Sequence, residues 1–210
     1  MLGLIKKDLL MIKSNLKILV ILFFVYGFMA YQGEMSLSFV LPFMSVMIMI
    51  STFSYDTYNQ WDAYAITLPN GRKNSVRAKY LVTILLIIIT TIIITILSVI
   101  ISYIKTKGVD YENVFSTILG AAFATTLLQS FMYPSIYKFG VEKARIGILM
   151  VIFGMIILGG IITKFINFEP IFLELDKLGN YWMIILPMIM IVILYLSYKI
   201  SECIYKKKEY

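Results

Sequence analysis

The chain has 210 residues, of which 60% are hydrophobic and 15% are charged, and its mean hydropathy is +0.86. Soluble domains are about 45–50% apolar and about 25% charged, so this composition excludes an ordinary soluble domain and predicts an all-α protein that crosses a membrane several times. There is no His, and Cys203 is the single Cys. These counts exclude imidazole chemistry, a disulfide framework and a clustered Cys/His metal site.

Residues 1–16 are predicted to form an amphipathic helix. Apolar residues recur at intervals of three and four from Leu2 to Leu16, and Lys6 and Lys13 lie off that stripe. A helix of this kind lies in the membrane interface with its apolar face toward the lipid. A core helix of a soluble protein has the same period, but this chain leaves no soluble core for it to cover.

Six apolar segments are predicted to cross the membrane, since about 20 mostly apolar residues span a hydrocarbon core about 30 Å thick. Two of the connections are long. Residues 54–80 join the second and third crossings on the cytoplasmic side, and residues 163–181 join the fifth and sixth on the outside. The predicted crossings are residues 15–31, 37–53, 81–104, 114–133, 146–162 and 182–198.

The positions of the basic residues support this topology. With the N-terminus in the cytoplasm, 15 of the 19 lysines and arginines fall in cytoplasmic segments, whereas the acidic residues divide evenly. Cytoplasmic loops of membrane proteins carry such an excess of Lys and Arg. The prediction is a multi-pass protein of the cell (plasma) membrane with both termini cytoplasmic. The net charge of +7 is dispersed between apolar segments, which excludes a nucleic-acid partner.

No acidic residue falls deep inside a predicted crossing, which disfavours a proton-driven carrier and an intramembrane protease. The third and fourth crossings do contain small and neutral polar residues. Two interpretations of these residues are open: they pack helices together, or they line a translocation route or a dimer interface. The candidates for the second interpretation are Thr91, Thr95, Gly120, Ala124, Thr125 and Gln129.

Residues 54–80 carry the most informative pattern. A short helix with aromatic anchors is predicted by Tyr55, Tyr58, Trp61, Asp62 and Tyr64. Leu68 to Gly71 then predict a stop and a turn. An aromatic belt at the membrane surface explains the rings, but it does not explain an additional helix outside the bilayer. The segment therefore favours docking to a cytoplasmic partner.

Two stretches of the sequence resemble a known family. Residues 61–69, followed by Arg72 and residues 76–81, resemble the loop between the second and third crossings of type-2 ABC exporter permeases. Residues 134–145 resemble a small bacterial branch of these proteins, which includes lantibiotic-type and phenol-soluble-modulin exporter permeases. Together with the six crossings and the amphipathic start, the resemblance covers essentially the whole chain.

The resemblance implies a homodimer or pseudo-dimer of this subunit in membrane lipid, bound to two cytoplasmic ATP-binding-cassette ATPase subunits. Residues 1–16 would be an elbow helix, a helix from Asp56 to Leu68 would be the coupling helix in an ATPase cleft, and residues 138–145 would lie near the same interface. The residues implied in ATPase coupling are Asp56, Tyr58, Trp61, Asp62, Tyr64, Leu68, Arg72, Glu142, Lys143 and Arg145.

The chain has no Gly-x-x-x-x-Gly-Lys-[Ser/Thr] phosphate loop. We therefore expect that the chain is not an enzyme by itself and binds no cofactor. ATP and Mg would be bound by the partner ATPase. The predicted function is export of an amphipathic peptide or another hydrophobic substrate. The alternative is a non-transporting membrane anchor or immunity protein that recruits a cytoplasmic partner through the same loop.

Overall fold

The computed structural model describes residues 2–32, 37–106, 111–150, 153–154 and 182–207. Within these residues the regular elements are all helices, which confirms the all-α class. Residues 141–150 are helical in addition to the named elements. The named elements are α1 (Leu2–Gln32), α2 (Leu37–Tyr58), α3 (Trp61–Thr67), α4 (Gly71–Thr106), α5 (Tyr111–Phe139) and α8 (Trp182–Lys207).

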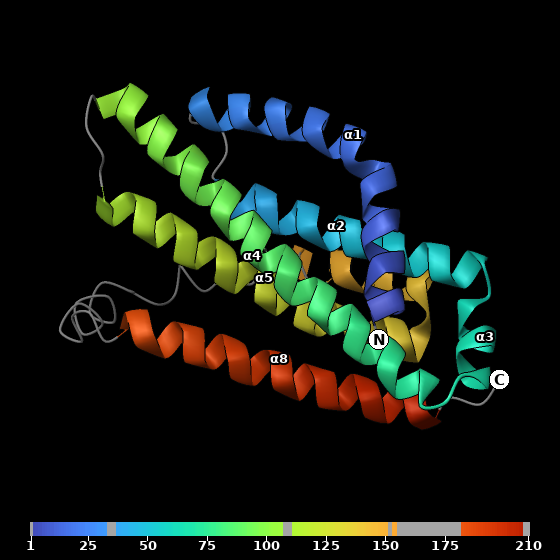
Figure 1. The fold of residues 1–210 in the computed structure, drawn as a ribbon. Helices are drawn as coiled ribbons and strands as arrows, with labels where there is room; N and C mark the ends of the chain where they lie inside the picture. The colour runs from blue at the N-terminus through green and yellow to red at the C-terminus, as the bar shows by residue number, and fades with distance from the viewer. Residues whose placement is uncertain (1, 33–36, 107–110, 151–152, 155–181, 208–210) are drawn as a thin grey trace.

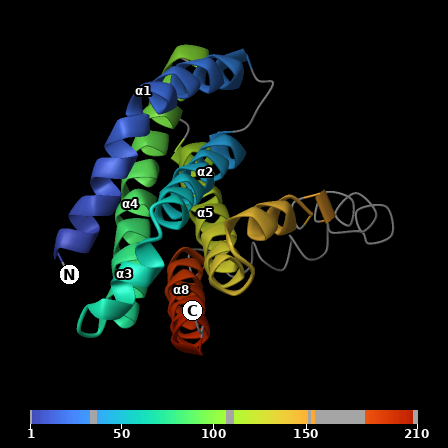
Figure 2. The ribbon, with the colours of Figure 1, turned by 90° about the vertical axis from the view of Figure 1, so that its right-hand side faces the viewer.

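The long helices lie lengthwise beside one another, with α5 packed against α2, α4 and α8 (Figure 1). Both chain termini lie at the end of this bundle where α3 is found (Figures 1 and 2). We call this end the α3 end. Helix α4 leads away from it, and α5 and α8 both run back toward it (Figure 1).

Helix α1 changes direction along its length. Its first part lies across the direction of α2 and α8 at the α3 end, and its second part turns toward the opposite end (Figures 1 and 2). It packs against α2 and α4. The predicted elbow helix, residues 1–16, and the predicted first crossing, residues 15–31, therefore belong to one helix with a bend.

Three of the described helices are long and apolar enough to cross a membrane: Gly71–Ile104, Val114–Phe139 and Ile185–Lys207. In Gly71–Ile104, only 22% of the most apolar part is buried in the protein, and in Ile185–Lys207 the buried share is 17%. Large side chains such as Ile92 and Ile191 are exposed along them. Soluble proteins rarely expose continuous apolar surfaces of this size, so these faces contact hydrocarbon and the chain is a multi-pass membrane protein.

The count of six crossings stays a prediction. Residues 37–53 lie on α2, and residues 146–150 and 153–154 of the fifth predicted crossing are helical. The rest of that crossing and the whole predicted outer loop, residues 163–181, lie outside the described residues.

Aromatic side chains hold the helices together in the half of the bundle near α3. The ring centroids of Tyr80 on α4 and Tyr133 on α5 lie 4.9 Å apart, and those of Tyr137 on α5 and Tyr205 on α8 lie 5.0 Å apart. Such pairs are worth about 0.5–1.5 kcal/mol beyond their buried area. The buried hydroxyl of Tyr80 shares hydrogen bonds with Ser197 Oγ at 2.6 Å and Ser201 Oγ at 2.9 Å. This end of the bundle is thus fixed by both packing and hydrogen bonds.

Most of residues 54–80 is helical, because α2 continues to Tyr58 and α4 begins at Gly71. Gln60, with φ of 49°, and Asn70, with φ of 55°, adopt the left-handed conformation on either side of α3. A left-handed residue does not continue a right-handed helix. The structure therefore divides the helix that the resemblance implied from Asp56 to Leu68: its first residues end α2, and the separate helix is Trp61–Thr67.

Gly71 begins α4 in direct contact with α3. A Cβ atom at this position would lie 1.8 Å from the carbonyl oxygen of Ala65. Because that oxygen belongs to the backbone, Gly71→Ala is expected to displace α3 and to lower stability by about 1–3 kcal/mol, as overpacking does. Thermal unfolding in detergent and proteolysis within α3 measure the effect. Gly27→Ala is the control, because a Cβ atom there meets nothing within 4 Å, and equal stability of the two variants would contradict the prediction.

Candidate functional site

Helix α3 is attached to the bundle through its inner side. The indole of Trp61 lies under Lys7 of α1, whose Nζ is 4.2 Å from the ring centroid. The Tyr205 hydroxyl of α8 donates a hydrogen bond of 2.8 Å to Asp62 Oδ1. Ala65 is fully buried, and its carbonyl faces Gly71 of α4. Three different helices, α1, α4 and α8, thus hold this short helix.

The opposite side of the α3 region is open. Tyr58, at the end of α2, is 87% exposed, and Tyr64 on α3 is 55% exposed. Leu68, which follows α3, is half-buried. The ring centroids of Trp61 and Tyr64 are 5.1 Å apart, so the inward ring of Trp61 packs against the outward ring of Tyr64. Exposed aromatic residues of this kind are frequent anchors of protein interfaces.

Four charged side chains from three helices form a closed cluster behind α3, which we call the ion ring: Lys7 and Asp8 of α1, Asp56 of α2 and Lys79 of α4. Lys79 Nζ lies 3.0 Å from Asp8 Oδ1 and 2.7 Å from Asp56 Oδ2. Lys7 Nζ lies 3.4 Å from Asp8 Oδ1 and also pairs with Asp56 Oδ1. Each lysine therefore contacts both aspartates.

The ion ring is largely withdrawn from solvent: Asp8 is 1%, Lys79 4% and Asp56 7% exposed. A buried charge is very unfavourable unless it is paired and hydrogen-bonded. Here two positive charges balance two negative ones, and Lys79 makes further contacts with Thr52 Oγ1 at 3.2 Å and with the Phe53 ring at 4.6 Å. The cluster is electrically neutral and fixes the relative positions of α1, α2 and α4.

A cavity of about 380 Å³ is bordered by α3, the ion ring, α5 and α8. Trp61, Asp62, Tyr137 and Tyr205 are among the residues that line it. Buried Trp61 Nε1 and Ser75 Oγ have no hydrogen-bond partner among the described residues. The inner side of α3 is therefore held by a few specific contacts and not by a close-packed core.

The second stretch implied in coupling lies at the same end. Gly140, with φ of +83°, ends α5, and its carbonyl accepts a hydrogen bond from Ala144 N in the next helical segment. Gly140 and Val141 line the same cavity as Trp61. Arg145 Nη2 donates to Ser54 Oγ of α2 at 3.4 Å. The charged side chains of Glu142, Lys143 and Arg145 are exposed.

The structure thus brings most of the predicted coupling residues to one end but gives them different environments. Asp56 is buried in the ion ring, and Arg72 Nη1 donates to the Lys206 carbonyl of α8 at 2.8 Å. These two side chains hold helices together. Tyr58, Tyr64, Glu142 and Lys143 are exposed. A role of these residues in ATPase coupling stays a prediction.

The residues predicted for a pathway or a dimer interface lie on α4 and α5 in different environments. The hydroxyls of Thr91, Thr95 and Thr125 donate to carbonyls of their own helices. Gln129 is fully buried and donates to Ser45 Oγ of α2 at 3.2 Å. Gly120 is exposed and Ala124 is half-buried. Thr125 and Gln129 therefore contribute to packing inside the subunit, and both original interpretations remain open for the others.

Sequence reasoning missed Lys7, Asp8 and Lys79 as site residues. A signal for Asp8 was present, because it lies three residues after Ile5 and four before Ile12, on the apolar side of the first helix. A carboxylate at such a position needs a buried partner. Lys79 was instead counted with the basic residues that mark the cytoplasmic side.

The lipid-facing long helices, with a short helix held at the end that carries both termini, define a polytopic α-helical membrane protein (Figure 1). The sequence matches the family described as ABC-2 family transporter protein over residues 3–206. Since the match covers nearly the whole chain, the protein belongs to this family of ABC transporter membrane subunits, which work with a cytoplasmic ABC ATPase. No curated protein and no solved structure matches it.

Removing the Tyr205 hydroxyl is expected to loosen α3. Hydrogen bonds to charged groups contribute about 1.5–3 kcal/mol, and Asp62 is only partly buried, so Tyr205→Phe is expected to lower stability by about 1–2 kcal/mol. Hydrogen exchange at residues 61–67, measured on the solubilised chain, is expected to increase as well. Tyr195→Phe, on an exposed position of the same helix, serves as the control. Unchanged exchange in Tyr205→Phe would refute this attachment.

Proposed function

We propose that the chain is the permease subunit of an ABC exporter in the plasma membrane, and that α3 is its coupling helix. The observation that carries the proposal is the two-sided environment of α3. Tyr64 on its outer side and Tyr58 at the end of α2 are exposed, and its inner side is bound to α1, α4 and α8. A partner that presses on the outer side thereby acts on three helices at once.

The motor is proposed to be a separate pair of ABC ATPase subunits, which bind ATP and Mg. Family membership supports an ATPase partner in general, and the sequence has no phosphate loop of its own. The exposed charges of Glu142 and Lys143 flank the same end and extend the proposed contact surface. Two copies of the permease, or one copy and a related subunit, would present two such surfaces to the two ATPases. Closure of the ATPases then rocks the packed helices between two states.

The proposed substrate is an amphipathic peptide or another largely apolar molecule. The resemblance of residues 134–145 to lantibiotic-type and phenol-soluble-modulin exporter permeases supports a substrate of this class. The hydroxyl oxygens of Thr91 and Thr95, which donate within α4, retain the capacity to accept a hydrogen bond. A non-transporting anchor that recruits a cytoplasmic partner is the alternative, and the experiments below separate the two.

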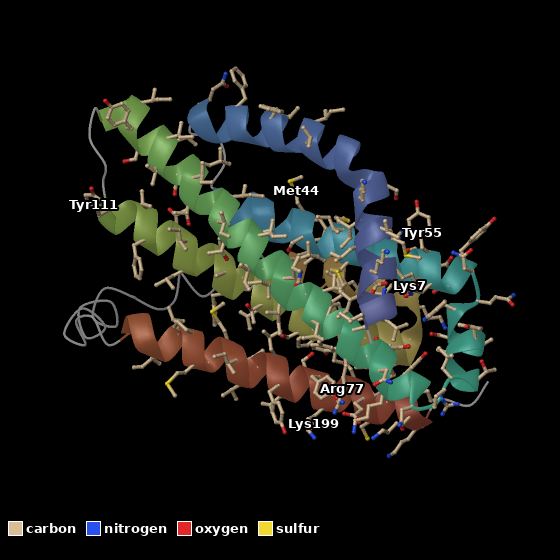
Figure 3. All side chains as sticks on the ribbon, viewed as in Figure 1. Lys7, Met44, Tyr55, Arg77, Tyr111 and Lys199 are labelled. Carbon is tan, nitrogen blue, oxygen red and sulfur yellow. The ribbon has the colours of Figure 1, made fainter. Side chains whose placement is uncertain are left out.

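The proposed topology places α3 in the cytoplasm and Tyr111 outside. In a Cys203→Ser background, which removes the single native thiol, Tyr64→Cys is expected to react with a membrane-impermeant maleimide only after the cells are opened. Tyr111→Cys, at the opposite end of the bundle (Figure 3), is expected to react on intact cells. Labelling of Tyr64→Cys on intact cells would refute the proposed orientation.

The proposed docking surface is tested by replacing its exposed rings. Tyr58→Ala and Tyr64→Ala together are expected to weaken recovery of the ATPase subunit with the tagged chain by about tenfold or more, because buried aromatic anchors dominate interface energies. Tyr111→Ala is the matched control, since this exposed ring lies at the other end. Recovery from native membranes is measured by mass spectrometry, together with the ATPase rate of the complex.

The two proposed functions predict different results for the wild-type chain. An exporter changes the ATPase rate of its bound partner and loses that effect in the double variant. An anchor recovers a partner whose ATPase rate is the same with and without the chain. Recovery of no nucleotide-binding protein by the wild-type chain would overturn the exporter proposal.

A further inference from the structure

The ion ring is a closed cycle of ion pairs. It links α1 to α2 and α4, which precede and follow α3 in the chain. Lys79 contacts Asp8 and Asp56, and Lys7 contacts the same two carboxylates. Asp56 lies two residues before the end of α2, and Lys79 lies eight residues after the start of α4. The cluster therefore connects α1 to both helices from which α3 is suspended.

Stability alone is a poor explanation for such a cluster. Replacement of buried ion pairs by apolar residues of similar volume is often neutral or stabilising, because the cost of removing two charges from water offsets their attraction. What a buried ring of charges does provide is a defined geometry, since every charge must keep its partners. The ring thus holds α1 in one position against α2 and α4.

The ring also reaches α3 itself. Lys7 lies over the Trp61 indole while it pairs with the two aspartates. The left-handed residues Gln60 and Asn70 bracket α3, and the cavity behind α3 leaves space beside this contact. A displacement of α3 that turns about these two residues therefore acts on Lys7 through Trp61.

From this geometry we propose that the ion ring is the joint through which α1 moves with α3. This inference rests on the proposed function of α3 but concerns different residues. The four residues of the ion ring are positioning residues. When α3 is displaced, they move the part of α1 that lies across the bundle. With the ring intact, α1 and α3 move as one body, and without it they move independently.

The first test uses the chain alone in lipid nanodiscs. Spin labels are placed at Leu10→Cys on α1 and Tyr64→Cys on α3, two exposed positions, in the Cys203→Ser background. The native ring is expected to give one narrow distance distribution. The combined variant Lys7→Met, Asp8→Leu, Asp56→Leu and Lys79→Met is expected to give a broadened one. An unchanged distribution in this variant would overturn the proposal.

Two further variants test whether the broadening arises only from a general loss of structure. Asp56→Asn with Lys79→Gln keeps the ring neutral and leaves the Lys7–Asp8 pair, so that partial broadening is expected at near-native thermal stability. The pair of exposed Lys206 and buried Glu202 on α8, 2.7 Å apart, is the control. Glu202→Gln with Lys206→Met removes one pair away from α1 and α3 and is expected to leave the distribution narrow. Broadening in this control, or none in the ring pair, would refute the assignment.

The second test asks whether the joint transmits movement in the complex with the recovered ATPase. Labels at Leu10→Cys and Tyr103→Cys, near the far end of α4, report the position of α1. Trapping with ATP, Mg and vanadate is expected to shift this distance with the native ring and to leave it unshifted in the four-residue variant, although the ATPase still binds. An equal shift in both would overturn the joint. Recovery of no ATPase by the native chain would instead refute the proposed function, and the nanodisc result would then decide the joint alone.

Discussion

The structure depends on one constraint: charged groups that leave water at the α3 end must neutralise one another. Asp8, Asp56 and Lys79 are almost fully buried, and an isolated charge at such positions would be strongly unfavourable. The four side chains of the ion ring satisfy this constraint only when α1, α2 and α4 occupy fixed relative positions. The apolar faces farther along α4 and α8 impose no such requirement, because lipid accepts any arrangement that keeps them covered. Specific geometry is therefore concentrated at the end that carries α3.

The other contacts at this end extend the same arrangement. The aromatic cluster of Tyr80, Tyr133, Tyr137 and Tyr205 connects α4, α5 and α8. The hydrogen bond from Tyr205 to Asp62 links this cluster to α3. Tyr137 and Tyr205 line a cavity together with Trp61 of α3. A helix held by a few directional contacts keeps its orientation and can still be displaced. Those are the two properties that a coupling element requires.

The sequence predicted the parts of this arrangement that depend on local patterns. Long apolar segments indicated the crossing helices, and the pattern from Tyr55 to Gly71 indicated a short helix followed by a turn. The sequence did not reveal the break at Gln60, because a non-glycine residue in the left-handed conformation has no strong local signal. It also did not reveal the ion ring, since residues 7, 8, 56 and 79 meet only after three helices have packed. Asp56 was selected as an ATPase-coupling residue, and the structure buries it among opposite charges.

The position of Trp61 bears on the choice between an interfacial belt and a coupling helix. An aromatic belt directs its rings toward the lipid headgroups, whereas Trp61 lies under Lys7 and lines the cavity inside the protein. Among the described aromatic residues of this region, Tyr55, Tyr58 and Tyr64 are exposed. An aromatic belt does not require an inward ring beside a buried cluster of charges. It also does not require a glycine at the position where a Cβ atom would push α3 away from α4. Both features follow directly if α3 must remain mechanically connected to the helices behind it.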